Sequence, residues 1–63
     1  MKAYILYTHD DRGPTPAMEV VTAADAEEAR RWARHRLAAS PHHRAVEIWL
    51  DEALIDRIEA PAA

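Results

Sequence analysis

The stretch "AVEIWLDEALIDRIEA", residues 45–60, decides the fold, because its apolar residues fit either a helix or a β-hairpin. In favour of a helix, Ser40-Pro41 is a suitable first turn, and no following residue up to Glu59 is a helix breaker. In favour of a hairpin, two short apolar runs flank the polar corner Asp51-Glu52. The stripe that a helix would form comprises Val46, Trp49, Leu50, Ala53, Leu54 and Ile58.

Two isoleucines favour the hairpin. A helix would expose Ile48 and Ile55 among acidic residues on the face opposite the apolar stripe. In a hairpin with a four-residue loop, residues 50–53, Ile48 pairs with Ile55. Trp49 then pairs with Leu54, and cross-strand apolar pairs of this kind stabilise a sheet. The corner lacks the Gly or Asn that two-residue turns prefer. We therefore predict a hairpin with the longer loop, and a second helix is the alternative.

The N-terminal third of the chain predicts two further strands. Residues 2–8, "KAYILYT", are rich in residues typical of strands and are apolar on both faces, as in a central strand or one covered on both sides. Residues 9–17 are predicted to form a loop because they contain Gly13-Pro14. Residues 18–22, "MEVVT", then form a strand that pairs antiparallel with the first.

A helix follows these strands. Its N-cap is either Thr22, with Asp25 three residues later, or Asp25, with Glu28 three residues later. The helix is predicted to end near Ala39, because Pro41 disfavours a helical conformation at the preceding residue. The small residues of its buried stripe allow close packing on a sheet, with Trp32 at the edge of that stripe. The stripe comprises Ala26, Ala29, Ala33 and Leu37.

The C-terminal pattern resembles that of a group of small uncharacterised bacterial proteins. It comprises Val46-Glu47-Ile48-Trp49, Asp51, Leu54-Ile55 and Arg57-Ile58, which look like the group's "VEVW-DG-xx-LV-x-R-I". The chain departs from that pattern at the turn, where Leu50-Asp51 replaces Asp-Gly. The resemblance implies a ββαββ arrangement and no assigned activity. We therefore expect an α+β fold, a four-stranded antiparallel sheet with one helix on one face in the order β-β-α-β-β. It would occupy residues 1–60 as one domain, with residues 61–63 as a frayed tail.

Length and composition restrict the class of protein. A domain of 63 residues buries only about 60% of the surface that its unfolded chain exposes, so it is marginally stable without a staple or a partner. The chain has no cysteine and therefore no disulfide or zinc–thiolate site. No stretch reaches the roughly 20 apolar residues that span a bilayer, and the apolar run at the N-terminus is short for a signal peptide. We expect a cytoplasmic protein that does not enter a membrane.

The charge pattern suggests an anion-binding surface. Between Glu28 and Glu47 there is no acidic residue, and this interval is rich in arginine. The net charge of −3 argues against a dedicated DNA-binding protein, yet an RNA- or anion-binding module remains an alternative function. The other interpretation is that these arginines solvate a helix. The candidate anion-binding residues are Arg30, Arg31, Arg34, Arg36 and Arg44.

Histidines and carboxylates offer few signs of catalysis. His9-Asp10-Asp11 has the groups of a metal-dependent enzyme site, but a polar loop after a strand explains the same residues. His35, His42 and His43 have arginines near them, which oppose cation binding. There is no nucleophile motif and no glycine-rich phosphate loop. We therefore predict no catalytic residue, no metal site and no cofactor.

The aromatic residues predict an interaction surface. One helix covers one face of the sheet, so the other face has surplus apolar area. We expect a second copy to cover that face or to pair with an edge strand, giving a homodimer, with an unidentified protein as the alternative partner. The favoured function is therefore a small self-associating binding or adaptor module. The candidate interface residues are Trp49, Trp32, Tyr4 and Tyr7.

Overall fold

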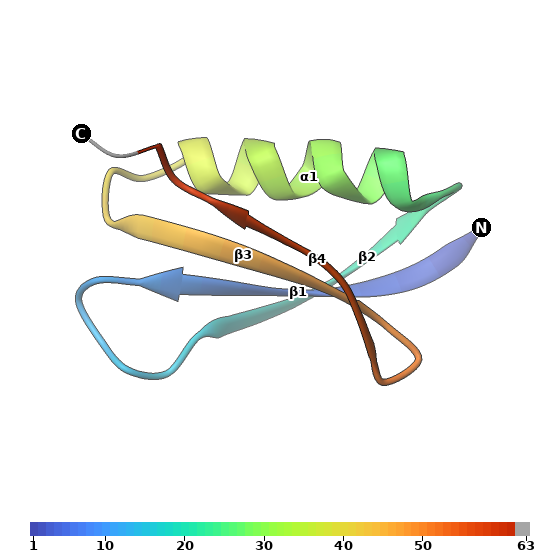
Figure 1. The fold of residues 1–63 in the computed structure, drawn as a ribbon, viewed down its shortest axis with the longest axis horizontal. Coiled ribbons are helices and arrows are strands. Elements are labelled where there is room, and N and C mark those ends of the chain that lie inside the picture. Colours follow the sequence, from blue (N-terminus) through green and yellow to red (C-terminus); the bar gives the residue numbers. More distant parts are fainter. Residues whose placement is uncertain (62–63) are drawn as a thin grey trace.

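A computed structural model describes residues 1–61 and confirms the α+β class and the predicted order of elements (Figure 1). Within these residues there is no helix long and apolar enough to cross a membrane. The predicted tail, residues 61–63, lies outside the described residues apart from Pro61. The elements are β1 (Lys2–Asp10), β2 (Ala17–Ala23), α1 (Ala26–Ala38), β3 (His43–Leu50) and β4 (Ala53–Glu59).

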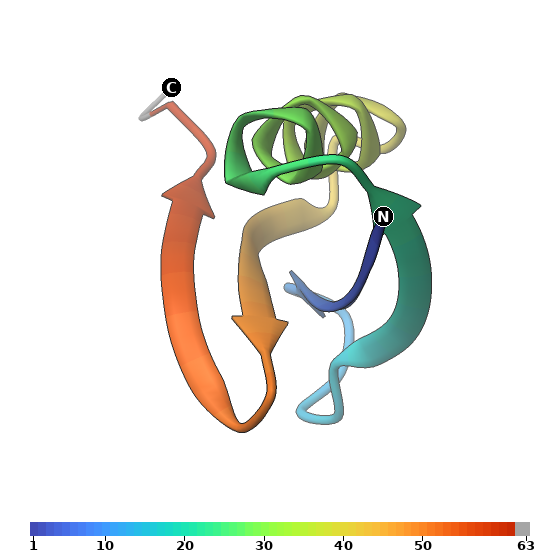
Figure 2. The same cartoon turned by 90° about the vertical axis from the view of Figure 1, so that its right-hand side faces the viewer.

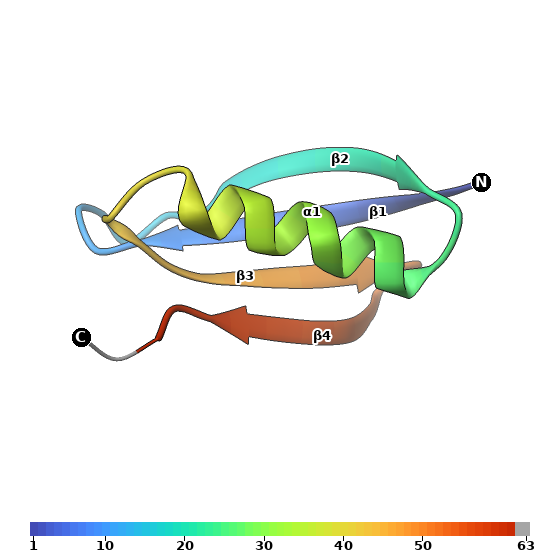
Figure 3. The ribbon, with the colours of Figure 1, turned by 90° about the horizontal axis from the view of Figure 1, so that it is seen from above.

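The strands form one sheet in the order β2-β1-β3-β4, and every neighbouring pair is antiparallel. Because β2 and β3 are both antiparallel to β1, they run in the same direction on either side of it. The chain between them crosses over the sheet as α1 (Figure 3). The central position of β1 explains why residues 2–8 are apolar on both faces.

The core lies between α1 and one face of the sheet (Figure 2). Alternate residues of each strand point toward the helix, and those in the middle of the central strands, such as Leu6, Val46 and Ile48, are fully buried. Ala29 and Ala33 are the buried residues of α1, and their small side chains let the helix approach the sheet closely. The largest side chains buried beneath the helix are Tyr4, Leu6, Val46 and Ile48.

Reciprocal hydrogen bonds begin the helix. The Glu28 N–H donates to Asp25 Oδ1 at 2.9 Å, and the Ala24 N–H donates to Glu28 Oε1 at 2.7 Å. Asp25 is therefore the N-cap, as in the second of the two predicted alternatives. At the other end Ala39 is the C-cap, as predicted from Pro41.

Residues 45–60 form the predicted hairpin, but its turn is tighter than expected. Leu50 pairs with Ala53, so the four-residue loop is replaced by a two-residue turn of Asp51 and Glu52. Both turn residues have positive φ angles, 50° and 70°. Two-residue hairpin turns with this backbone match the twist of the strands, which explains why the chain adopts one without Gly or Asn.

A β-bulge next to the turn corrects the predicted register. Trp49 pairs with Leu54, as expected, but Ile48 pairs with Asp56 and not with Ile55. The register shift between Ile48 and Trp49 leaves Ile55 as an extra residue in β4. The bulge shifts the register of β4 by one residue and so keeps Ile58 packed against the core. Without the bulge, the two-residue turn would place Ile58 on the other face of the sheet.

Replacing Glu52 by glycine should stabilise the protein. A non-glycine residue in the left-handed region costs about 1 kcal/mol, which Glu52→Gly removes. We expect the free energy of unfolding, measured by chemical denaturation, to rise by about 1 kcal/mol. Ala53→Gly is the control, because a glycine in the adjacent strand should lower stability. Equal losses in both variants would contradict the assigned turn.

Candidate functional site

The face of the sheet turned away from α1 is the main candidate site. We call it the open face and define it by the apolar side chains of Ile5, Tyr7, Met18, Val20, Trp49 and Leu54. Within it one apolar row crosses all the strands, because Ile5 pairs with both Val20 and Trp49, and Trp49 pairs with Leu54. The two ends of this row are well exposed, Val20 at 59% and Leu54 at 49%.

An aromatic pair and a carboxylate lie at the centre of the open face. The rings of Tyr7 and Trp49 meet edge to face, with centroids 6.5 Å apart. Glu47 lies beside them and accepts hydrogen bonds from Arg57 Nη1 at 2.8 Å and from Trp49 Nε1 at 3.3 Å. Together with Pro16, these rings and Glu47 line a shallow pocket of about 330 Å³.

The charge of Glu47 is matched within the chain. Its burial opposes ionisation, but hydrogen bonds from Trp49 and Arg57, together with the nearby His9, outweigh burial and lower its pKa below the ordinary value. His9 Nε2 lies 3.5 Å from the carboxylate. Covering this part of the open face would therefore bury a matched ion pair and not an isolated charge.

The structure separates the four candidate interface aromatics. Tyr7 and Trp49 meet on the open face. Tyr4 does not belong to this surface, because β-strand alternation turns it under the helix, where it is 1% exposed. Trp32 lies on the outer side of α1, 45% exposed, in a shallow pocket with Arg31 and His35.

Each of the five candidate anion-binding arginines lies next to an acidic side chain. Arg36 makes two hydrogen bonds to Glu19, at 2.9 and 2.6 Å, across the boundary between α1 and β2. Arg31 and Arg34 are the most loosely held of the helix arginines. The closest ion-pair distances of the other four are Arg30–Asp56 2.8 Å, Arg44–Asp11 2.6 Å, Arg34–Glu27 3.3 Å and Arg31–Glu28 3.9 Å. Anion binding by this set stays a prediction.

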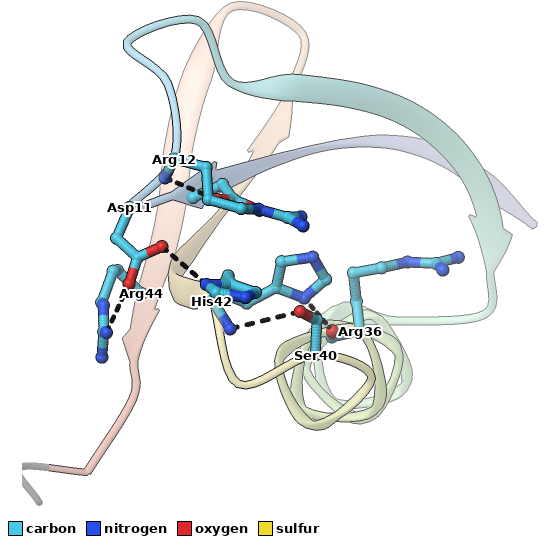
Figure 4. A network of polar contacts seen from close by, with 8 residues as sticks. Asp11, Arg12, Arg36, Ser40, His42 and Arg44 are labelled. Atoms are coloured by element: carbon cyan, nitrogen blue, oxygen red, sulfur yellow. Dashed lines mark hydrogen bonds and ion pairs between the residues drawn. The ribbon is translucent and has the colours of Figure 1, made fainter.

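The side chains of His9-Asp10-Asp11 do not converge. His9 lies on the open-face side near Glu47, as described above. Asp10 accepts three hydrogen bonds from Arg12, at 2.7, 3.0 and 2.7 Å. Asp11 points the other way, toward the loop after the helix (Figure 4). Within residues 1–61, no group of three His, Asp or Glu side chains is arranged to hold a metal ion.

Asp11 instead joins two loops. Its backbone N–H donates to the His42 carbonyl at 2.9 Å, and its carboxylate accepts from His42 Nδ1 at 3.1 Å and Arg44 Nη2 at 2.6 Å. The next histidine, His43, donates from Nδ1 to the Arg36 carbonyl at 2.7 Å, which ties the loop to the helix end. Local pattern cannot reveal this cluster, because Asp11 is 31 residues from His42.

Comparisons with known protein families, curated proteins and solved structures found no match to this chain. The resemblance of residues 46–58 to small bacterial ββαββ proteins therefore stays a prediction.

Stability should fall at acid pH and depend on Asp11. Its hydrogen bond from Arg44, assisted by His42, lowers the pKa of Asp11 despite burial, and Arg30 likewise lowers the pKa of Asp56. A carboxyl with a depressed folded-state pKa stabilises the fold above its unfolded pKa, near 4, and this stabilisation is lost as the pH falls further. We expect Tm to fall below about pH 4, and to fall less steeply in Asp11→Asn.

Glu52→Gln is the matched control for this measurement. It removes a turn carboxylate that makes no ion pair in the described part of the chain, so its acid profile should follow the parent protein. Identical acid profiles for Asp11→Asn and the parent would contradict the role of the loop cluster.

Proposed function

We propose that this chain is a small, non-catalytic binding module of the cytoplasm that forms a homodimer through its open face. The observation that supports this proposal most directly is the apolar row of Val20, Ile5, Trp49 and Leu54, which spans the sheet without a helix over it. Contiguous exposed apolar surface of this kind is typical of interaction sites.

The charges of the open face support a second copy as the occupant. Glu47 and Arg57 already satisfy one another, so two identical faces meet without needing a complementary charge from a different partner. Stacking two such faces places apolar row against apolar row. The buried area also helps a chain whose single core is small, because apolar burial contributes about 25 cal/mol per Å².

Leu54→Lys should dissociate the dimer without unfolding the protein. Leu54 is half exposed, so a lysine there keeps its charge in water in the monomer but would be buried in the dimer. We expect light scattering across a dilution series to show that Leu54→Lys has half the mass of the parent protein, because the variant loses the open-face contact. A parent protein that is a folded monomer at every concentration would overturn the proposed dimer.

The two tryptophans provide a matched pair of variants. Trp49→Ala removes a half-buried ring from the open face and its contact with Tyr7. We expect it to cost about 3 kcal/mol, a large part of the roughly 5 kcal/mol that stabilises a small domain, and to abolish folding or dimerisation. Trp32→Ala should retain both fold and mass, because Trp32 lies on the outer side of the helix. Circular dichroism and light scattering of the same samples distinguish these outcomes.

The alternative function is RNA or anion binding by the outer side of α1. It is favoured by the exposed Trp32 beside Arg31, an arrangement that suits base stacking next to a phosphate contact. Arg31 is 66% exposed and its ion pair is long, so its side chain is available.

A fluorescently labelled single-stranded RNA tests this alternative. If the outer side of α1 binds RNA, affinity should fall with salt, and Trp32→Ala should weaken binding whereas Leu54→Lys should not. Arg31→Gln should reduce the slope of log affinity against log salt by about 0.7. No binding at low salt would remove the alternative.

A further inference from the structure

The two edges of the sheet are protected to different degrees. The edge strand β4 carries Asp56, Arg57 and Glu59, and a register shift lies between it and β3. Charged side chains and bulges on an edge strand hinder the addition of another strand. The other edge strand, β2, is seven residues long and contains neither proline nor a basic residue.

Glu19, the single charged residue of β2, is paired with the helix. Glu19 lies on the helix side of the sheet, where Arg36 holds its carboxylate through two hydrogen bonds, at 2.9 and 2.6 Å. On the opposite side β2 presents uncharged residues, of which Met18 is 62% exposed and Val20 59% exposed. Unlike β4, this edge therefore lacks the exposed charges and the bulge that oppose strand pairing.

A symmetric antiparallel pair can form between the β2 strands of two copies, but not along the full length of two β4 strands. An antiparallel pair of β2 strands centred on Val20 places Val20 opposite Val20, Met18 opposite Thr22 and Glu19 opposite Val21. No like charges face each other in this register. The same operation on the full length of β4 places Asp56 opposite Asp56, a destabilising arrangement.

We propose that β2 pairs antiparallel with β2 of a second copy, centred on Val20. Residues opposite each other in this register lie on the same side of the sheet, so both helices lie on one side of the joined sheet and both open faces on the other. The apolar row then continues across the joint, because Val20 is its end. This contact uses a different surface from the open-face dimer, and the two together give an assembly of four copies.

Single-cysteine variants test the register directly, since the chain has no cysteine of its own. Facing Cα atoms in an antiparallel pair are about 4.5–5.5 Å apart, within the range that a disulfide bridges. We expect Val20→Cys to form a disulfide-linked dimer in a glutathione redox buffer. In Thr22→Cys the two cysteines would be roughly 13 Å apart along the strands, so this variant should remain unlinked.

A mixed sample gives a second, independent measurement. Met18→Cys alone should remain unlinked, but an equimolar mixture with Thr22→Cys should form the mixed dimer, because these positions face each other in the proposed register. All these positions are exposed, so folding should be retained, which circular dichroism checks. Equal linking of all variants, or no linking of Val20→Cys, would overturn the proposal.

The double variant Val20→Cys/Leu54→Lys separates this proposal from the open-face dimer. Leu54 lies at the far edge of the sheet, so its charge should not disturb a β2 pair. Under oxidising conditions, we expect the double variant to form the disulfide-linked dimer. In the reduced state, we expect it to lose the open-face contact. If Leu54→Lys leaves the mass of the parent protein unchanged and Val20→Cys still links, the open-face dimer fails and the β2 pairing stands.

Discussion

One helix covers one side of a four-stranded sheet, and most other features of the molecule depend on this constraint (Figure 2). The helix-facing residues Leu6 and Ile48 are fully buried, whereas their neighbours on the open face are covered only by each other. Tyr7 and Trp49 pack edge to face there, and Glu47 is held by Arg57 beside them. Residues 1–61 contain no second helix to cover that surface, which is why the open face is the natural place to look for a partner.

The small residues of α1 explain the arrangement of the arginines. Ala29 and Ala33 let the helix lie close to the sheet, but they contribute little buried area. Arg30 and Arg36 extend from the two sides of the helix to acids on opposite edge strands, Asp56 of β4 and Glu19 of β2. Their charges are matched by these acids. The arginine-rich interval therefore has a structural role whether or not it also binds anions.

The same pairings determine what each edge of the sheet presents. At β4 the acids and Arg57 remain at the edge, and the bulge next to Trp49 disturbs the ladder. At β2 the strand's acid is taken up by the helix, so a regular and uncharged edge is left. The contact that secures the helix to the sheet is thus also the one that leaves β2 open to strand pairing.

Much of the fold follows from local pattern. The strand periodicity of residues 2–8 and 18–22, the capping pair Asp25 and Glu28, and the stop at Pro41 are short-range signals, and the structure has each element at or near these positions. Both strands are longer than expected, so the predicted loop 9–17 is wrong at its ends, where His9 and Asp10 belong to β1 and Ala17 belongs to β2. Residues 45–60 form a hairpin because two isoleucines would otherwise be exposed. The candidate surface was also predictable in outline, since a sheet with a single helix must leave one face uncovered.

The sequence by itself determined the elements, their order and the excess of apolar surface, because propensity, capping and periodicity act over a few residues. Only the tertiary structure decided that Tyr4 lies under the helix, that Asp51 and Glu52 form a two-residue turn, and that a bulge moves Ile55 out of register. It also decided that Arg30, Arg36 and Arg44 pair with Asp56, Glu19 and Asp11. These outcomes depend on pairings between residues far apart in the chain, such as Asp11 with Arg44, 33 residues away, and only the assembled sheet brings such groups within hydrogen-bonding distance.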